Sequence, residues 1–256
     1  MADESNTVLY QVDGGIARLT LNRPEKRNAL NEALIANLKS NLRQANADAA
    51  VRVVVISGAG RDFCSGADLA ALQKISEASV AENVADARSL MELFNLMRQV
   101  SVPIVAAVRG KALAGGCGLA SACDIVIAST SARFGYPEVK IGFVPAMVTA
   151  ILRRNVSEKR AFELITRGAE ITAEEARQLG LVNQILTDEN FEAEVTAYAR
   201  GFETMSKSAV ALTKTLLYQI DGMAFGDALE TGVDVNVIAR MTEDGKKGIA
   251  QFLKKD

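Results

Sequence analysis

The stretch GKALAGGCGLASACDIVIAS, residues 110–129, places Gly115, Gly116 and Gly118 directly in front of a predicted helix. Glycine weakens both helices and strands, so a glycine cluster indicates that the backbone must approach something closely. Two interpretations fit: close packing of a helix on a strand, or approach of a ligand oxygen to the N–H groups that begin the helix. No basic cluster or GK[ST] sequence lies nearby, which disfavours a phosphate loop. A carbonyl oxygen that becomes negative during a reaction fits such fixed N–H donors better.

Four apolar segments around and before this cluster are predicted strands. VPIVAAV (residues 102–108) precedes the glycines and DIVIAS (residues 124–129) follows them, and such short, continuous apolar runs are typical of buried strands. VRVVVISGAG (residues 51–60) predicts a third, parallel strand, and IARLTLN (residues 16–22) predicts a fourth with alternating faces. Because helical patterns separate these strands, the sequence predicts an α/β fold with a helix-covered sheet.

The helical patterns have recognisable starts. Asn31 is the predicted N-cap of a helix with leucines at helical spacing, and residues 79–99 form a long amphipathic stretch. Beyond Pro145 the pattern is almost entirely helical, with Ser157 and Thr172 as predicted caps.

Residues 196–256 carry two apolar stripes that predict a helical subdomain. The residues that recur at steps of three or four are Phe202, Met205, Ala209, Leu212, Leu216 and Ile220, followed by Leu229, Val233, Val237 and Met241. Two such helices cannot bury a stripe alone, so they must pack on the core or on another subunit. We therefore expect two domains, residues 1–195 and residues 196–256.

The composition excludes several classes of function. The 256 residues contain no histidine, which excludes Ser-His-Asp and Cys-His nucleophilic mechanisms and imidazole metal ligation. The three cysteines lack the CxxC spacing of a zinc site. Any chemistry must therefore depend on carboxylates, lysines or backbone dipoles. The formal net charge of −2, without a basic block, makes nucleic acid an unexpected partner.

The sequence also bears on location. The odd number of cysteines, Cys64, Cys117 and Cys123, fits a reducing compartment. The N-terminal segment MADESNTVLYQVDGG has neither the basic nor the apolar region of a secretory signal, and no run of about 18 apolar residues occurs. We expect a cytoplasmic protein without a membrane span.

Two further loops follow buried strands. The GAG at residues 58–60 matches the opening of a dinucleotide fingerprint, but Phe63 stands where its third glycine belongs, which disfavours a dinucleotide site. CSGADL, residues 64–69, is either a tight turn that requires Gly66 or a turn that aims the backbone N–H of Ala67 into a cleft. Together with the glycine cluster, the second interpretation suggests a pair of N–H donors that form an oxyanion hole.

Four co-linear motifs carry a family resemblance. NRPEKRNAL, DFCSGADL, VPIVAAVRGKALAGGCGLASACDIVIAS and ARFGYPEVKIGFVP resemble, in order and spacing, the crotonase (enoyl-CoA hydratase/isomerase) superfamily over about residues 8–190. The resemblance implies a crotonase-like spiral of repeated strand–strand–helix turns, with C-terminal helices that mediate trimerisation in homotrimers or homohexamers. It also implies acyl-CoA thioester substrates, in which CoA is part of the substrate, and no separate cofactor or metal.

The resemblance implies roles for individual residues as well. Ala67 and Gly115 match the two N–H donors to the thioester oxygen, and Gly116 matches the position beside them. The residues that match the CoA-binding site are Lys26, Arg27, Asn28, Ala29 and Leu30 at its edge, with Gly66, Asp68 and Leu69. For the two basic residues the alternatives are a contact with CoA phosphates and an exposed position in a solvated loop.

One catalytic carboxylate of the family's hydratases is absent. Gly118 stands where those enzymes carry their first glutamate, whereas Glu138 in FGYPEV matches the second. Two carboxylates share the work of adding water, but one is enough to move a proton along an enoyl chain. We therefore expect isomerisation of a 3-enoyl-CoA to a 2-enoyl-CoA. A hydratase of a short or branched 2-enoyl-CoA and a non-catalytic acyl-CoA-binding homologue remain as alternatives.

A second departure lies downstream of this glutamate. Many family members have a glycine-rich PGAGG-like stretch where this chain reads VPAMVTAIL. Met147 and Val148 are either helix core or apolar bulk beside the acyl group. We expect Lys111 at the surface, and Cys117 as a packed side chain rather than a nucleophile.

Overall fold

The computed structural model describes residues 6–254 and places two sheets at the centre of the chain. Within that range one sheet has the order β1-β2-β3-β4-β6-β9 and a smaller one the order β5-β7-β8. The pairs from β2 to β9 are parallel, and β1 joins β2 in an antiparallel hairpin. The strands are β1 (Val8–Asp13), β2 (Ile16–Leu21), β3 (Val53–Gly58), β4 (Ile104–Val108), β5 (Lys111–Leu113), β6 (Ile125–Ser129), β7 (Arg133–Gly135), β8 (Glu170–Thr172) and β9 (Gln184–Leu186).

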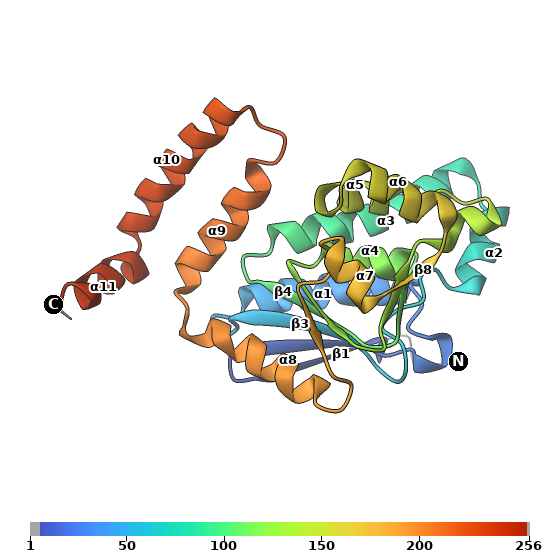
Figure 1. The fold of residues 1–256 in the computed structure, drawn as a ribbon, viewed down its shortest axis with the longest axis horizontal. Helices are drawn as coiled ribbons and strands as arrows, with labels where there is room; N and C mark the ends of the chain where they lie inside the picture. Colours follow the sequence, from blue (N-terminus) through green and yellow to red (C-terminus); the bar gives the residue numbers. More distant parts are fainter. Residues whose placement is uncertain (1–5, 255–256) are drawn as a thin grey trace.

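Helices cover both faces of the large sheet (Figure 1). They are α1 (Glu32–Ala47), α2 (Leu69–Glu77), α3 (Val80–Gln99), α4 (Gly115–Ala122), α5 (Ala146–Asn155), α6 (Glu158–Arg167), α7 (Ala173–Gln178), α8 (Phe191–Arg200), α9 (Lys207–Gln219), α10 (Phe225–Met241) and α11 (Glu243–Phe252). Short 3₁₀ turns are η2 (Pro24–Lys26), η3 (Pro137–Ile141) and η4 (Gly201–Thr204). The order β4-β5-α4, then β6-β7 with its helices, then β8-α7-β9 confirms the predicted spiral of strand–strand–helix turns. No helix in residues 6–254 combines the length and apolarity that a membrane crossing needs.

Each face of the large sheet has its own apolar core. One core contains, among others, Val54, Ile56, Ala106, Leu34, Leu38, Phe94 and Met97, from the sheet, α1 and α3. The other contains Val53, Val55, Val105, Ile127, Phe191, Val195 and Ala199, from the sheet and α8. Alternate residues of one strand thus enter different cores. Burial on both faces explains why the parallel strands are continuously apolar in the sequence.

Local capping signals were reliable guides to helix starts. The side chain of Asn31 accepts a hydrogen bond from the backbone N–H of Leu34 at 3.0 Å, as predicted. Thr172 and Glu175 form a reciprocal capping box at the start of α7. Ser157 does precede α6, but its side chain makes no capping hydrogen bond with the described residues.

The predicted stripe of residues 202–220 is wrong at its start. Phe202 lies in η4 and Met205 follows it, and α9 begins only at Lys207, capped by the side chain of Ser206. Local hydrogen bonding of Ser206 thus ends the irregular segment where apolar spacing alone gave no sign of a break.

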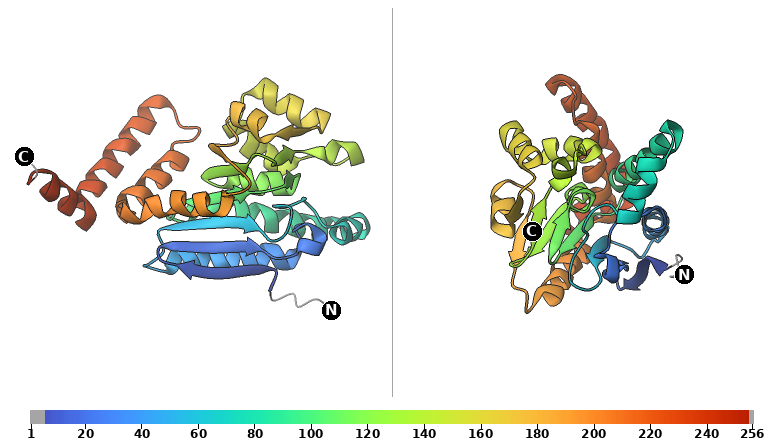
Figure 2. Two further views of the ribbon diagram at one scale, coloured as in Figure 1. Left: turned by 60° about the horizontal axis from the view of Figure 1, so that its bottom comes forward. Right: turned by 90° about the vertical axis from the view of Figure 1, so that its right-hand side faces the viewer.

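Helices α9 to α11 extend away from the two sheets, as Figure 2 shows from two further directions. Apolar side chains exposed on this arm include Leu217, Phe225, Leu229, Val233, Val237 and Met241. The predicted division after residue 195 falls within α8, which packs on the sheet. The two-domain division and the trimeric or hexameric assembly both stay predictions.

A buried ion pair ties α9 to the core. Nζ of Lys214 lies 2.7 Å from Oδ2 of Asp124 and donates to the backbone oxygen of Val102 at 3.0 Å. The hydroxyl of Tyr218 donates to Oδ1 of the same carboxylate at 2.6 Å, and the backbone N–H of Ile104 donates to Oδ2 at 2.7 Å. Burial lowers the pKa of Lys214, and the neighbouring carboxylate opposes that shift.

Replacing Asp124 with alanine is expected to lower the free energy of unfolding by about 3–5 kcal/mol, because Lys214 then stays buried without its counter-charge. The matched control is Glu170→Ala, which breaks the exposed pair between Lys111 and Glu170 (2.8 Å) and costs about 0–1 kcal/mol. Urea unfolding of both variants makes the comparison. Equal losses would show that the buried pair contributes no more than a surface pair.

Candidate active site

Three backbone segments meet beside the carboxyl ends of β2, β3 and β4. Leu30 donates to the backbone oxygen of Gly66 at 2.6 Å, and Asp68 donates back to Leu30 at 3.1 Å. Cys64 donates to Lys111 at 3.0 Å, and its own oxygen accepts from Leu113 at 2.9 Å. These bonds fix the 64–68 loop between residues 27–30 and β5, so Ala67 and the start of α4 are held by backbone pairing.

Close packing leaves no room for a side chain at Gly116 or Gly118. A Cβ atom on Gly116 would lie 2.2 Å from the backbone oxygen of Cys64, so the first turn of α4 rests directly on that backbone. A Cβ atom on Gly118 would lie 2.1 Å from Cγ1 of Val148 in α5. Neither glycine lines the cavity described below.

Gly115, in contrast, borders a cavity that a ligand could enter. It lines a cavity of about 680 Å³, and the nearest heavy atom to its Cβ position is Cδ1 of Leu30, at 3.1 Å. Ala67 lines the same cavity. A Cβ atom on the neighbouring Gly66 would lie 3.5 Å from the backbone nitrogen of Gly115, which shows how closely the two loops approach. Neither the Ala67 nor the Gly115 N–H finds an acceptor among residues 6–254. Two residues with a free backbone N–H, as far as the described part of the chain shows, therefore line one cavity.

The backbone before Gly115 is strained. Ala114, the N-cap of α4, has φ 51° and ψ −128°, a conformation that L-residues adopt at a cost of about 1–3 kcal/mol. Its N–H donates to the oxygen of Gly135 at 2.8 Å, and its own oxygen accepts from Gly118 at 3.0 Å. These bonds hold the strained residue at the start of α4. The sequence shows no signal for this feature, because alanine is the residue least suggestive of a special backbone angle.

Glu138 supplies a partly buried carboxyl group to the cavity. It lies in η3, directly after β7, and lines the cavity with Ala67 and Gly115. Its Oε2 is buried and has no hydrogen-bond partner among the described residues. Burial raises the pKa of Glu138 above its ordinary value. A carboxyl group so placed is suited to accept and return a proton.

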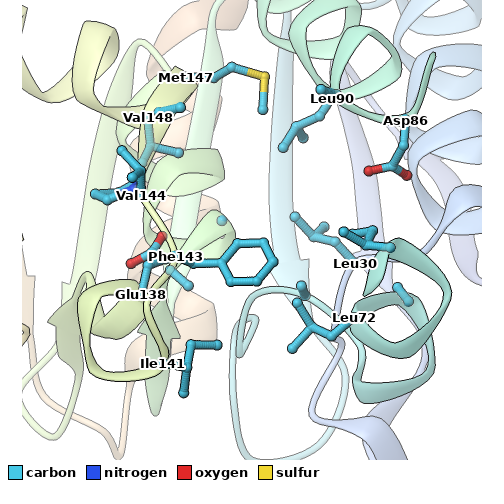
Figure 3. Close-up of a pocket in the computed structure, with 18 of the residues that line it drawn as sticks. Leu30, Leu72, Asp86, Leu90, Glu138, Ile141, Phe143, Val144, Met147 and Val148 are labelled. Carbon is cyan, nitrogen blue, oxygen red and sulfur yellow. The ribbon is translucent and has the colours of Figure 1, made fainter. Parts of the chain in front are cut away.

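Apolar side chains form most of the remaining walls (Figure 3). Val144, Val148 and Ile141 lie on the side of Glu138, and Leu30, Leu72 and Leu90 lie across the cavity, with the ring of Phe143 between them. Asp86 of α3 also lines the cavity, on the wall opposite Glu138. The sequence did not single out Leu72 or Asp86, because tertiary packing alone brings α2 and α3 over the site. Phe143 lies within the motif that contains Glu138, but its role as a cavity wall was not predicted.

Of the residues predicted to bind or act on substrate, Leu30, Ala67, Gly115 and Glu138 line the cavity. Asn28 is fully buried, and its amide donates to the backbone oxygens of Ala59 and Asp62 at 2.9 and 2.7 Å. Ala29 is also buried. Asn28 and Ala29 therefore support the loop at residues 27–30 from its buried side.

Four of the other predicted CoA-binding residues are not among the described residues that line the cavity: Lys26, Arg27, Gly66 and Asp68. Lys26 and Arg27 are exposed in and after η2. Asp68 forms an ion pair with Arg23 at 2.6 Å, and Gly66 adopts φ +96°. Leu69 is the first residue of α2, but its side chain lies outside the described part of the structure. CoA contacts at all of these positions stay predictions.

Two neighbouring side chains behave as expected from the sequence. Cys117 is buried, and burial raises the pKa of its thiol to about 11, which makes it a poor nucleophile. Lys111 is half-exposed and pairs with Glu170. Met147 and Val148, for which two interpretations were open, both line the cavity, while Val148 is also buried in the core.

Comparison with known proteins identifies the family. The sequence model of the enoyl-CoA hydratase/isomerase family matches residues 11–256. A Thermus thermophilus protein whose name includes the words enoyl-CoA hydratase is 42% identical, covering 96% of this chain and 98% of that one. The 2,3-dehydroadipyl-CoA hydratase of Escherichia coli is 36% identical, covering 93% and 91%. The crystal structure of a Mycobacterium smegmatis enoyl-CoA hydratase superposes with a TM-score of 0.93 at 30% identity, covering 97% and 96%. The chain therefore belongs to the enoyl-CoA hydratase/isomerase family.

The raised pKa of Glu138 predicts a pH dependence of stability. A carboxyl group whose pKa is higher in the folded state stabilises the fold below its unfolded pKa, and this contribution is lost as pH rises through the folded pKa. Glu138→Gln removes the ionisable group, so the free energy of unfolding of this variant should increase relative to that of the wild type as pH rises above 4.5, the ordinary pKa of a glutamate. Urea unfolding across this range provides the measurement.

Glu163→Gln is the control of opposite sign. Hydrogen bonds from Arg160 and Arg167 lower the pKa of Glu163, so its contribution is present above the unfolded pKa and lost as pH falls. This variant should lose stability relative to wild type as pH rises. The same sign for both variants would contradict the environment described for Glu138.

Proposed function

We propose that the protein isomerises a 3-enoyl-CoA to a 2-enoyl-CoA by a proton shift through Glu138. The observation that carries this proposal is one cavity lined by Ala67, Gly115 and Glu138. Among residues 6–254, the two backbone N–H groups have no acceptor, and Oε2 of Glu138 is buried without a hydrogen-bond partner. The thioester carbonyl accepts both N–H groups, and CoA enters as part of the substrate. The reaction needs no separate cofactor.

The proposed reaction has two proton transfers. Ionised Glu138 takes a proton from C2, next to the thioester carbonyl, and the electrons of the C2–H bond move into a dienolate. The N–H groups of Ala67 and Gly115 stabilise the negative oxygen, which is worth about 10²–10³-fold in rate per donor at comparable sites. Glu138 then returns the same proton to C4, so the double bond moves to C2–C3 and no atom is gained or lost. Its raised pKa brings the carboxyl closer to the affinity for protons that such a shuttle needs.

Hydration of a 2-enoyl-CoA is the second candidate. It is favoured by the names of the relatives, several of which are hydratases, including the Escherichia coli protein and a crotonyl-CoA hydratase of Syntrophomonas wolfei. It is disfavoured by the site, because Gly118 supplies no second carboxylate beside Glu138, and Asp86 lies on the opposite wall. A protein that binds acyl-CoA without turnover is the third candidate, and the assays below separate all three.

Glu138→Ala is expected to lower the rate of 3-enoyl-CoA isomerisation by about 10²–10⁴-fold, the usual contribution of a general acid–base group, while acyl-CoA binding is retained. The assay is run beside hydration of a 2-enoyl-CoA, with exposed Glu163→Ala as the matched control. Isomerisation that survives in Glu138→Ala would falsify the role of this carboxylate. Hydration by the wild type without isomerisation would favour the second candidate, and binding without either turnover the third.

Gly66→Ala tests the N–H donors separately. Gly66 has φ +96°, and a Cβ atom on it would lie 2.7 Å from Cβ of Ala114, so the substitution must displace the Ala67 N–H, the Gly115 N–H or both. A fall in kcat of about 10²–10³-fold is expected. Gly222→Ala is the control, because Gly222 has a similar φ of +87° but open space around its Cβ position. Equal effects of the two variants on kcat would rule out a special role for the loop at Gly66.

A further inference from the structure

Val148 occupies the space into which a side chain at position 118 would extend. A Cβ atom on Gly118 would lie 2.1 Å from Cγ1 and 3.0 Å from Cβ of Val148, and 3.6 Å from Cζ of Phe94. A separation of 2.1 Å is too short for two carbon atoms that are not bonded, so a larger residue at position 118 requires Val148 to move. Val148 is only 4% exposed, which leaves it little room to do so.

The same valine borders the cavity on its other side. Val148 lines the cavity together with Glu138, and the two side chains lie along one wall with Val144 between them (Figure 3). Val148 therefore separates position 118 from the space in front of the carboxylate. The wall that it forms there is apolar.

We propose that Val148 is a specificity-determining residue that restricts this site to proton transfer and excludes the addition of water. The inference rests on the proposed function and deepens it. A held water needs two to four polar partners, and at this part of the wall the described side chains beside Glu138 are Val144 and Val148. Adding water forms a C–O bond at C3 and delivers a proton to C2, so a second polar group must orient the water while Glu138 handles protons.

The absence of a carboxylate at position 118 and the presence of Val148 thus belong together, because the two side chains would occupy the same space. Glutamate at 118 is excluded as long as Val148 keeps its γ-carbons, because backbone packing holds α4 from the other side through Gly116 and Cys64. Restoring the second carboxylate requires both positions to change together.

The first test is a stability cycle that does not depend on activity. Gly118→Ala should lower the Tm in the wild-type background and should have little effect in a Val148→Gly background, where the atoms that it would meet are gone. Equal effects of Gly118→Ala in the two backgrounds would overturn the steric arrangement.

The second test uses the full chain and measures hydration of a 2-enoyl-CoA. The variants are Gly118→Glu, Val148→Gly and the double variant. The double variant should hydrate about 10²-fold faster than either single variant, the lower end of what a positioned acid–base group contributes. The matched control combines Gly118→Glu with Ile151→Ala, since Ile151 lies one turn along α5 and is not among the described residues that line the cavity. This control should hydrate no faster than Gly118→Glu alone.

Two outcomes would overturn the inference: hydration by Gly118→Glu alone that equals the double variant, and a folded double variant that gains no hydration. The experiment also separates this inference from the proposed function, which is read from 3-enoyl-CoA isomerisation by the wild type. A wild type that does not isomerise, together with a double variant that gains hydration, would reject the isomerase and uphold the role of Val148.

Discussion

The contact on which the site depends is the one between the backbone of Cys64 and the first turn of α4. At Gly116 the helix lies so close to the Cys64 oxygen that no Cβ atom fits between them. This approach brings together two segments that follow different strands of the large sheet, and each contributes one N–H group to the cavity. Because both donors belong to the backbone, their position is set by sheet pairing and by the strained Ala114. Side-chain rotamers contribute nothing to it. Preorganised donors of this kind need no reorganisation when charge develops on a bound oxygen.

The environment of Glu138 follows from the same packing. Its carboxyl group extends into a cavity with mostly aliphatic walls, and burial raises its pKa because the charged form is poorly solvated. The two backbone donors have the opposite effect, since they stabilise negative charge on a substrate oxygen. These two features, a carboxyl group with a raised pKa and two backbone donors at the same cavity, are the ones on which the proposed proton transfer rests.

Much of the fold could be predicted because its signals are local. The buried parallel strands were visible as short apolar runs, and Asn31 and Thr172 marked helix starts by side-chain capping that depends on neighbouring residues alone. The motifs also pointed to Ala67, Gly115 and Glu138, and the structure places all three at one cavity, while their catalytic roles stay predictions. The break before Lys207 was missed because apolar spacing continues through it, although Ser206 is a recognisable cap. Asn28 looks like a ligand-binding residue in the sequence, yet it is fully buried and bonded to Ala59 and Asp62.

What the sequence could not separate were the roles of the three glycines. Gly115, Gly116 and Gly118 form one cluster in the sequence, and they differ only in what lies next to each missing Cβ atom. Gly115 borders a cavity, Gly116 contacts the backbone of Cys64, and Gly118 contacts Val148. Two of these three neighbours come from segments distant in the chain, so no local pattern encodes them. The same fact bears on how family membership translates into a reaction. The relatives named as hydratases share about a third or more of their residues with this chain, which is enough to show the family. In our proposal, the reaction depends on whether the space between positions 118 and 148 holds a carboxylate or the two γ-carbons of Val148, a local difference that overall sequence identity does not reveal.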